Sequence, residues 1–457
     1  MTDPPLQSYL RFIAIDIHKH YLMIGAIDAA QQVVLLPRRV ELSRWPHWAH
    51  ANLLPTDAVV TYATTNAWAI YDLLAPLVGR AVVVHPAKVK LIAASRVKTD
   101  KVDGVSLAHL LRADLLPEVW VPPQHVRDLR ALLSHRRRLV SLQTTAKNRL
   151  QSVLHRLNLR PPDGDAFAHK QRAWWIELTL SSTERLRVDQ DVATLDHVAA
   201  QIADIDVELR RLSTSEEWVE QVPYLIQVPG IALLSAMTIL GAVGDITRFA
   251  TAKKLVGYAG LGAGVHDSGK THRDKGITKQ GRRDLRFVLV EAARVAVQTH
   301  PYWKHEFARL AKRIGEHKAV VAIARKLLIV VWHVLMSKSA DRRADAEQVA
   351  FKLMVWSWKL TNEQRGGLSS RQFIRAHLLR LGLGEDLTHI TRGGTKRPLA
   401  TIEEVLALRP ELRDPPDTVC GREAPGGPVP AGTVYPTGQG HGKRAMGLSD
   451  GGASRSN

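Results

Sequence analysis

The strongest constraint on the fold is the spacing of short apolar runs in the first 115 residues. Three such runs, RFIAIDI (11–17), YLMIGAID (21–28) and QVVLLP (32–37), follow one another with few residues between them. Apolar runs of this length are typical of strands. Helix and strand patterns then alternate: a helix around 44–54, a strand at 57–63, a helix at 67–77, a strand at 81–86, and helices at about 87–94 and 100–113. This order predicts a mixed sheet flanked by helices.

Two long helices are expected between about 124 and 215, separated by 159–167 and a stretch with Trp174 and Trp175. Apolar residues recur there at roughly heptad spacing, which predicts an antiparallel helical hairpin or coiled-coil arm. They are Val126, Leu129, Leu133, Val140, Leu150, Val153 and Leu157 in the first helix, and Leu195, Val198, Ile202, Ile205, Leu209 and Leu212 in the second.

The first of these helices is also basic. Its cations are Arg127, Arg130, Arg136, Arg137, Arg138, Lys147, Arg149 and Arg156, with few acids between them. One interpretation is a solvated face that binds nothing. We favour an arm that binds a nucleic-acid backbone or positions a dimer.

The remaining chain is mainly helical, so the expected fold class is α/β plus α. We predict an α/β unit at 10–120, the arm at 121–215, a helical unit at 222–340, a helical extension at 341–410 and a tail at 414–457. The tail holds ten Gly and six Pro, a composition that cannot bury a core, so it is expected to be disordered.

The charge balance indicates the class of partner. Lys and Arg number 63 against 44 Asp and Glu, a net charge of +19, which favours DNA, RNA or an anionic membrane. The longest apolar run, 327–336, is too short for a membrane span and fits a buried helix, and the first residues lack a signal-peptide pattern. The single cysteine, Cys420, excludes an internal disulfide and a cysteine zinc site. A cytosolic nucleic-acid protein without a membrane partner is expected.

Three aspartates are the candidate metal ligands. Asp16 lies near the end of the first strand, and Asp100 and Asp103 are three residues apart where a helix is expected to begin. Carboxylates converging from a strand and a helix can hold Mg²⁺ for phosphodiester chemistry, with Lys98 and Lys101 beside them to hold the backbone. The other interpretation is that Asp100 caps the helix and Asp103 favours its first turn.

A second candidate contact is the turn at Gly230. The stretch LIQVPGIALLSAMTIL (225–240) is similar to a helix-hairpin-helix, in which a glycine turn offers backbone N–H groups to a DNA phosphate. The usual second glycine is Ala232 here, and a plain turn between helices is the alternative.

The stretch 244–286 combines glycines with cations. We predict a flexible loop that wraps a phosphate backbone, with Lys270, Arg273, Lys279, Arg282 and Arg283 among its contacts. Within it, Ser268 and Gly269 alone would be an ordinary turn pair.

Taken together, these motifs resemble the insertion sequence 110 family of transposases over roughly residues 10–340. The matching stretches are IAIDIHKHY (13–21), ATTNAWAIYDLL (63–74), HPAKVKLIAASRVKTDKVDGVSLAHLL (85–111), LRALLSHRRRLVSLQTTAKNRLQSVLHRLN (129–158) and YAGLGAGVHDSG with ITKQGRRDLR (258–286).

The resemblance implies an N-terminal domain like the RuvC Holliday-junction resolvase, with an RNase H-like fold and a DEDD-type Mg²⁺ site formed by Asp16, Asp100 and Asp103. It further implies that Ser268 is the nucleophile of a transposase domain. The implied partners are donor and target DNA, a structured noncoding guide RNA, and further copies of the chain in a dimer or tetramer.

The sequence departs from the family pattern at one position. The family places a glutamate before ATTNAW, where this chain has Tyr62. A neutral phenol replaces a carboxylate poorly as a Mg²⁺ ligand, and water or Asp57 would be poor substitutes. Three hypotheses therefore stay open: a serine recombinase that moves an insertion sequence, a metal-dependent junction nuclease that uses water, and a decayed transposase that only binds nucleic acid.

Overall fold

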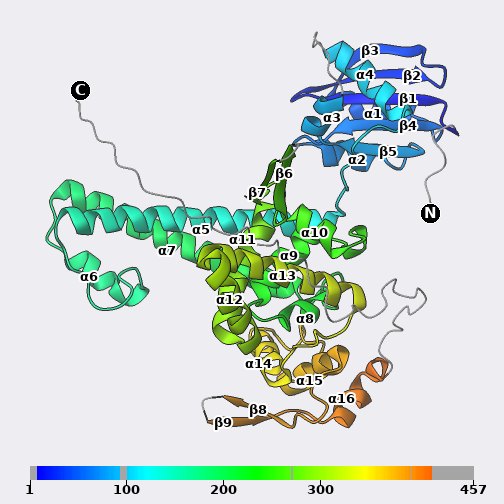
Figure 1. Cartoon of the computed structure of the whole chain (residues 1–457). Coiled ribbons are helices and arrows are strands. Elements are labelled where there is room, and N and C mark those ends of the chain that lie inside the picture. The colour runs from blue at the N-terminus through cyan, green and yellow to red at the C-terminus, as the bar shows by residue number, and fades with distance from the viewer. Residues whose placement is uncertain (1–7, 93–99, 269–270, 393, 414–457) are drawn as a thin grey trace, which may run out of the picture.

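The N-terminal part of the chain is a five-stranded mixed sheet covered by helices on both faces (Figure 1). The computed structural model describes residues 8–92, 100–268, 271–392 and 394–413, without the side chains of 90–92, 100–104, 265–268, 271–275 and 392. The strand order is β3 (Val33–Glu41), β2 (Tyr21–Asp28), β1 (Arg11–Ile17), β4 (Asp57–Tyr62) and β5 (Arg80–Val84). Strands β2 and β3 are antiparallel to their neighbours, whereas β4 and β5 run parallel to β1. The predicted mixed sheet is confirmed.

Alternate residues of the central strand enter two separate cores. Ile13 and Ile15 pack under α1 (Trp45–Asn52) and α2 (Ala67–Leu74). Phe12 and Ala14 face the other way, against α4 (Asp100–Arg112) and the first part of α3 (Pro86–Ile92). A strand buried on both faces reads as a continuous apolar run, which is why β1 was evident from its sequence.

The arm consists of two long helices side by side, α5 (Gln124–Arg156) and α7 (Ser182–Leu212), and extends from the body (Figure 1). The short helix α6 (Arg172–Glu177) closes its far end, where Trp175 joins Leu150 and Leu195 in a small core. The predicted helical pair is confirmed.

The expected packing phase of α5 was partly wrong. Val140 and Leu157 are 36% and 41% exposed, whereas Leu139 and Leu154 are buried. A helix of 3.6 residues per turn drifts from a strict seven-residue repeat, so the apolar seam moves by one position along its length.

The body of the molecule is helical. Its helices are α8 (Gln221–Ile226), α9 (Leu233–Val243), α10 (Ala252–Tyr258), α11 (Arg283–Thr299), α12 (Pro301–Ile314) and α13 (Glu316–Ser337). Helix α13 lies in the middle of this core, with Ile323, Leu327 and Val331 fully buried. The expectation that no apolar segment reaches membrane-spanning length was wrong, because α13 qualifies by length and composition. The core helix of a folded domain passes the same test, and the buried residues of α13 fit that role in this unit.

Two predicted loop or helical regions contain β-hairpins instead. Strands β6 (Ala263–Ser268) and β7 (Thr271–Ile277) pair where a flexible cationic loop was expected. The extension after α13 contains helices α14 (Ala346–Ser357), α15 (Ser370–Leu381) and α16 (Ile402–Leu408), but also the hairpin of β8 (His389–Arg392) and β9 (Thr395–Pro398). In both regions the backbone hydrogen bonds between paired strands determine the local structure. The predicted disordered tail lies outside the described residues.

Candidate active site

Asp16 lies at the carboxyl end of the central strand. Its strand neighbours Phe12 and Ala14, at the same side of the pleat, face helix α4, which places position 16 on the α4 face of the sheet. Its side chain is 21% exposed. In the parallel pairing of β1 with β4, Ile15 is opposite Thr61, so the next positions along the two strands are Asp16 and Tyr62.

Helix α4 runs antiparallel to β1, which places its first turn above the end of the strand that carries Asp16. At the other end of α4, Arg112 Nε donates to the carbonyl of Ala29 at 2.9 Å, and its guanidinium lies 5.7 Å from the ring centroid of Phe12. Ala29 follows β2, beside the start of β1. A helix of 13 residues is about 20 Å long, close to the length of a seven-residue strand.

The structure therefore brings positions 16, 100 and 103 to one end of the sheet, although they are far apart in sequence. Position 103 is one helical turn before Leu107, which is buried against the sheet, so both lie on the same helix face. The side chains of Asp100, Lys101 and Asp103 are not described, and Lys98 lies outside the described residues.

Neither Tyr62 nor Asp57 supplies the missing carboxylate. Tyr62 is half-buried against the apolar cluster beneath α4. Asp57 is fully buried at the opposite end of β4, where Arg11 Nη2 lies 2.7 Å from Asp57 Oδ2 and the backbone N–H of Leu54 donates to the same oxygen. The geometry agrees with the expectation that Asp57 is a poor substitute for the missing ligand.

Among the side chains that the structure describes, no group of three acidic, histidine or cysteine residues is placed to hold a metal ion. The predicted donors at this end of the sheet are one carboxylate on β1 and two carboxylate positions on α4, and oxygen donors of this kind suit Mg²⁺ or Mn²⁺. The structure adds His18, whose Nε2 lies 3.2 Å from Asp16 Oδ2 and which the sequence motifs do not predict as a site residue. The stretch DIHKHY places this histidine two residues after the aspartate, and that spacing was the available signal.

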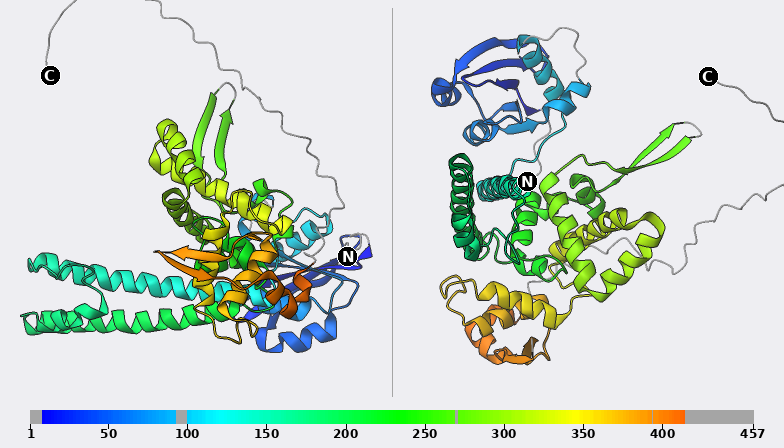
Figure 2. Two further views of the ribbon diagram at one scale, coloured as in Figure 1. Left: turned by 90° about the horizontal axis from the view of Figure 1, so that it is seen from below. Right: turned by 90° about the vertical axis from the view of Figure 1, so that its left-hand side faces the viewer.

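Ser268 lies at the end of β6, paired with Thr271 of β7 across the hairpin. The hairpin projects from the helical body, and Figure 2 shows it well away from the N-terminal sheet. A single copy of the chain thus does not bring Ser268 to the end of the sheet that carries Asp16. Lys270 lies outside the described residues, and Arg273 is on β7 with its side chain not described.

Five of the cations expected on the arm divide into two groups, whereas Arg127 and Arg156 are paired with Asp72 and Glu184. Arg136 is held by Asp206, with Nε and Nη2 at 2.7 and 3.2 Å from its carboxylate, and Arg149 lies 3.1 Å from Asp191. These two join α5 to α7. Three others are not engaged in ion pairs in the described part of the arm: Arg137 and Arg138 are exposed, and Lys147 lies 5.5 Å from the Phe167 ring centroid.

Cations also gather where the hairpin meets the body. Lys279 and Arg283 are exposed, whereas Arg282 is paired with Asp284 through Nε and Nη2 at 3.0 and 2.5 Å. Burial, and then the charge of Arg282, lowers the pKa of Arg130 to about 10, and Arg130 Nε donates to the carbonyl of Gly241 at 2.6 Å. Arg130 therefore holds the arm onto the body, whereas the pair of Arg282 with Asp284 is local to the start of α11.

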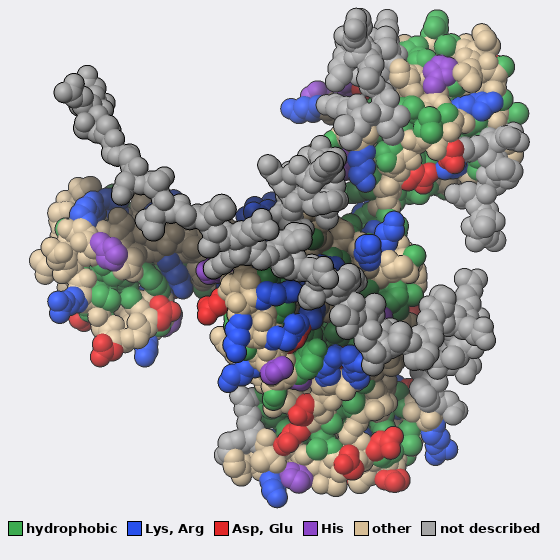
Figure 3. Space-filling model, viewed as in Figure 1, with side chains coloured by type: hydrophobic (Ala, Val, Ile, Leu, Met, Phe, Trp, Pro, Cys, Tyr) green, Lys and Arg blue, Asp and Glu red, His purple; other side chains and the backbone are tan. Residues whose placement is uncertain are grey.

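Lys and Arg side chains gather over the helical body in Figure 3, whereas acidic side chains gather at its C-terminal end. This asymmetry gives the body a face that attracts a polyanion.

Gly230 lies in the turn between α8 and α9, with a φ of +80°. A Cβ at this position would lie 2.0 Å from the carbonyl oxygen of Ala292 in α11. Close backbone packing therefore accounts for the glycine without a phosphate ligand.

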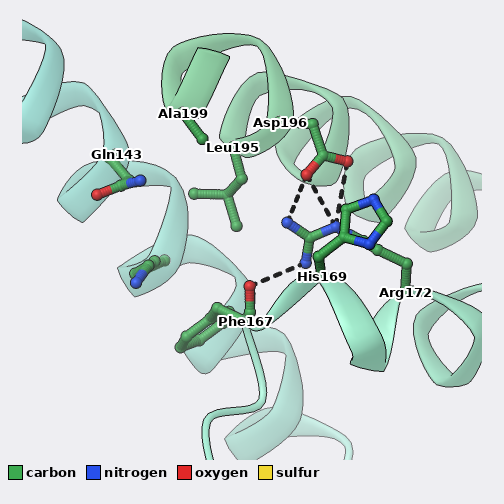
Figure 4. A pocket seen from close by; sticks show the side chains of 8 residues that line it. Gln143, Phe167, His169, Arg172, Leu195, Asp196 and Ala199 are labelled. Carbon is green, nitrogen blue, oxygen red and sulfur yellow. Dashed lines mark hydrogen bonds and ion pairs between the residues drawn. The ribbon is translucent and has the colours of Figure 1, made fainter. Parts of the chain in front are cut away.

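A polar cavity of about 430 Å³ lies at the far end of the arm (Figure 4). Arg172 crosses it, donating from Nη2 to Asp196 at 2.6 Å and from Nη1 to the carbonyl of Phe167 at 3.1 Å. The hydrogen bond from Arg172 lowers the pKa of Asp196. Because these groups satisfy one another, their hydrogen bonds stabilise the tip of the arm. The cavity is therefore not a candidate active site.

Family models of known proteins match both the N-terminal part of the chain and the helical body. A DEDD transposase model matches residues 13–159, and a model described as Transposase IS116/IS110/IS902 family matches residues 222–309. The transposase for insertion sequence element IS1111A of Coxiella burnetii is 26% identical over 348 residues, 73% of this chain and 92% of that protein. The pilin gene-inverting protein of Moraxella bovis is 28% identical over 323 residues, 66% of this chain and 88% of that protein.

The two models match in order along the chain and together cover just over half of it. The first includes the sheet, α4 and the start of the arm, and the second includes the hairpin with Ser268. The mixed sheet is compatible with a DEDD nuclease-like fold. On this evidence, the protein belongs to the IS110 family of transposases.

Proposed function

We propose that the protein is a site-specific DNA recombinase that moves an insertion sequence, with Ser268 as nucleophile and Asp16, Asp100 and Asp103 as metal-binding carboxylates. The observation that carries the proposal is the antiparallel course of α4 over β1, which gathers three acidic positions at one end of the sheet. The strand order β3-β2-β1-β4-β5 supports a RuvC-like RNase H fold for residues 10–120.

In the proposed reaction, Ser268 Oγ attacks the phosphorus of a DNA phosphodiester and loses its proton to a base or to water. A bond forms between Oγ and phosphorus, and the bond from phosphorus to one deoxyribose oxygen breaks, with that oxygen leaving as a hydroxyl. The phosphoserine diester keeps the bond energy, so a hydroxyl from another strand can reverse the step and release serine.

The carboxylates would hold Mg²⁺, which when bound stabilises negative charge on the phosphate oxygens. Arg283 and Lys279, exposed beside the hairpin, would hold the phosphate backbone and offset charge as it develops. Lys270 and Arg273 would contact the same DNA strand.

Because the hairpin and the sheet are apart in one copy, the complete site would form between copies in a dimer or tetramer. Two duplexes must be cut and joined, which also favours an even-numbered assembly. The pilin gene-inverting relative supports recombination between two DNA sites as the reaction class.

The family resemblance further suggests a structured noncoding RNA that pairs with donor and target DNA. Arg137, Arg138 and Lys147 on the arm are available for its backbone. Recognition through phosphate and shape would leave sequence choice to base pairing.

The test is a denaturing gel for a covalent protein–DNA adduct. Wild type should form the adduct in Mg²⁺ with DNA carrying the insertion-sequence ends, and Ser268→Ala should not. Thr271→Ala is the matched control, because Thr271 is the hydroxyl residue directly across the hairpin. An adduct that persists in Ser268→Ala would refute the serine role, and hydrolytic cutting by that variant would establish the junction nuclease instead.

Tyr62 supports one other candidate function, a decayed transposase that binds nucleic acid without chemistry. Position 62 is the neighbour of Asp16 across the parallel strands, yet it carries a phenol. Strand exchange by wild type would dismiss decay, whereas exchange only by Tyr62→Glu would establish it.

A further inference from the structure

His18 is held next to Asp16 by an aromatic stack. Its ring lies parallel to that of Tyr21, with centroids 4.4 Å apart and an interplanar angle of 18°. The guanidinium of Arg39 lies 4.1 Å from the Tyr21 centroid, and Arg39 Nε is fixed by Glu41 at 2.8 Å. The histidine ring is therefore oriented before any ligand arrives, which reduces the entropy lost when it binds one.

The separation of the two side chains suits a shared ion. Ligands of Mg²⁺ or Mn²⁺ lie at about 2.0–2.2 Å from the metal, so two neighbouring ligands of an octahedron are about 3 Å apart. Asp16 Oδ2 and His18 Nε2 are 3.2 Å apart. The side chains of Asp16 and His18 are 21% and 27% exposed, and the Nε2 atom of His18 is itself covered from solvent.

We propose that His18 Nε2 is the fourth protein donor of the metal site and replaces the carboxylate absent at position 62. The inference rests on the proposed function, because it presupposes that Asp16 binds a divalent cation. His18 and Tyr62 lie at the same end of the sheet on either side of Asp16, the histidine along β1 and the tyrosine on β4. A nitrogen donor here favours transition-metal ions over Mg²⁺, because imidazole is a softer ligand than carboxylate.

The experiment measures Mn²⁺ bound to the full-length protein by pulsed electron paramagnetic resonance. Wild type should show the ¹⁴N coupling of a directly bound imidazole, and His18→Ala should lose that coupling and bind Mn²⁺ at least about tenfold more weakly. His20→Ala is the matched control, since His20 is an exposed residue of the same turn and should retain both properties.

Two further variants separate this inference from the proposed function. If Asp16→Asn leaves Mn²⁺ binding unchanged, the carboxylate site itself is refuted. If Asp16→Asn abolishes binding but wild type lacks a His18-dependent ¹⁴N coupling, only the role of His18 is refuted. Adding Tyr62→Glu to His18→Ala should restore Mn²⁺ affinity without restoring the nitrogen coupling, and a failure to regain affinity would contradict the idea that the histidine replaces that carboxylate.

Discussion

Replacing Gly230 by alanine tests the packing of the turn between α8 and α9. The added Cβ would lie 2.0 Å from the carbonyl oxygen of Ala292 and 2.8 Å from its carbonyl carbon. Both are backbone atoms of a buried helix and have no flexible end that could move aside. The turn and α11 must therefore separate.

The expected loss follows from two contributions. A residue other than glycine at a φ of +80° costs about 1–2 kcal/mol, and forcing an extra carbon into a packed core costs about 1–3 kcal/mol. Together they destabilise the helical body by about 2–5 kcal/mol. For a unit of this size, that corresponds to a fall in melting temperature of at least about 4 °C.

Thermal unfolding of the full chain measures this effect. Gly257→Ala is the control: Gly257 is exposed on α10, no atom lies within 4 Å of its added Cβ, and the change should raise stability by up to about 1 kcal/mol. A Gly230→Ala protein that melts like wild type but loses DNA binding would refute the packing argument and support the phosphate contact instead.

Three other predictions concern charge. Hydrogen bonds from Arg309 and from a neighbouring lysine lower the pKa of Glu306 from its ordinary 4.5 to about 2. The stability that ionised Glu306 contributes is therefore complete above pH 4.5 and is lost as the pH falls toward 2. Thermal melts of Glu306→Gln should show a smaller loss of melting temperature over this pH range. Burial lowers the pKa of Lys352 from 10.5 to about 7. Between pH 7 and pH 10.5 the unfolded chain therefore binds more protons than the folded chain, so the free energy of unfolding should rise with pH. Lys352→Met should abolish this rise. Arg138→Ala should reduce the salt-dependence slope of DNA or RNA binding by about 0.9, whereas Arg136→Ala should leave the slope unchanged because Arg136 is already paired within the arm.

The elements of the sheet could be predicted because local patterns specify them. The strands 11–17 and 21–28 match β1 and β2 in full. Strand β3 was expected to end at Pro37 but continues to Glu41. Proline lacks an N–H for the ladder, but β3 is an edge strand, where one side needs no partner.

The two hairpins differ from the expected structures, a flexible glycine-rich loop at 244–286 and a helical extension at 341–410. In β6 and β7, residues 263–268 pair with 271–277, with a register shift between Ala263 and Val265. In β8 and β9, the pair Gly393-Gly394 separates two short runs, and a Gly-Gly pair between such runs is itself a hairpin signal.

The candidate site depended on long-range geometry that no local pattern contains. The sequence gives Asp16, Asp100 and Asp103 as acids near element ends, which fits helix caps as well as metal ligands. Only the antiparallel course of α4, anchored by Arg112 on Ala29, places the three positions together. The proximity of His18 to Asp16 likewise depends on the β1–β2 turn.

The hairpin changes what the serine can do. A flexible loop could fold back onto the sheet of its own chain, whereas Ser268 sits at the end of a paired strand whose base is anchored to the body. Next to that base, the backbone N–H of Thr278 donates to the carbonyl of Gly262 at 2.9 Å, and that of Arg282 donates to Tyr258 at 2.9 Å. Reaching the carboxylates of the same copy would require these contacts to break. Insertion of the intact hairpin into the sheet end of another copy would require no such loss, and this is the physical reason why we propose that the serine acts within an assembly.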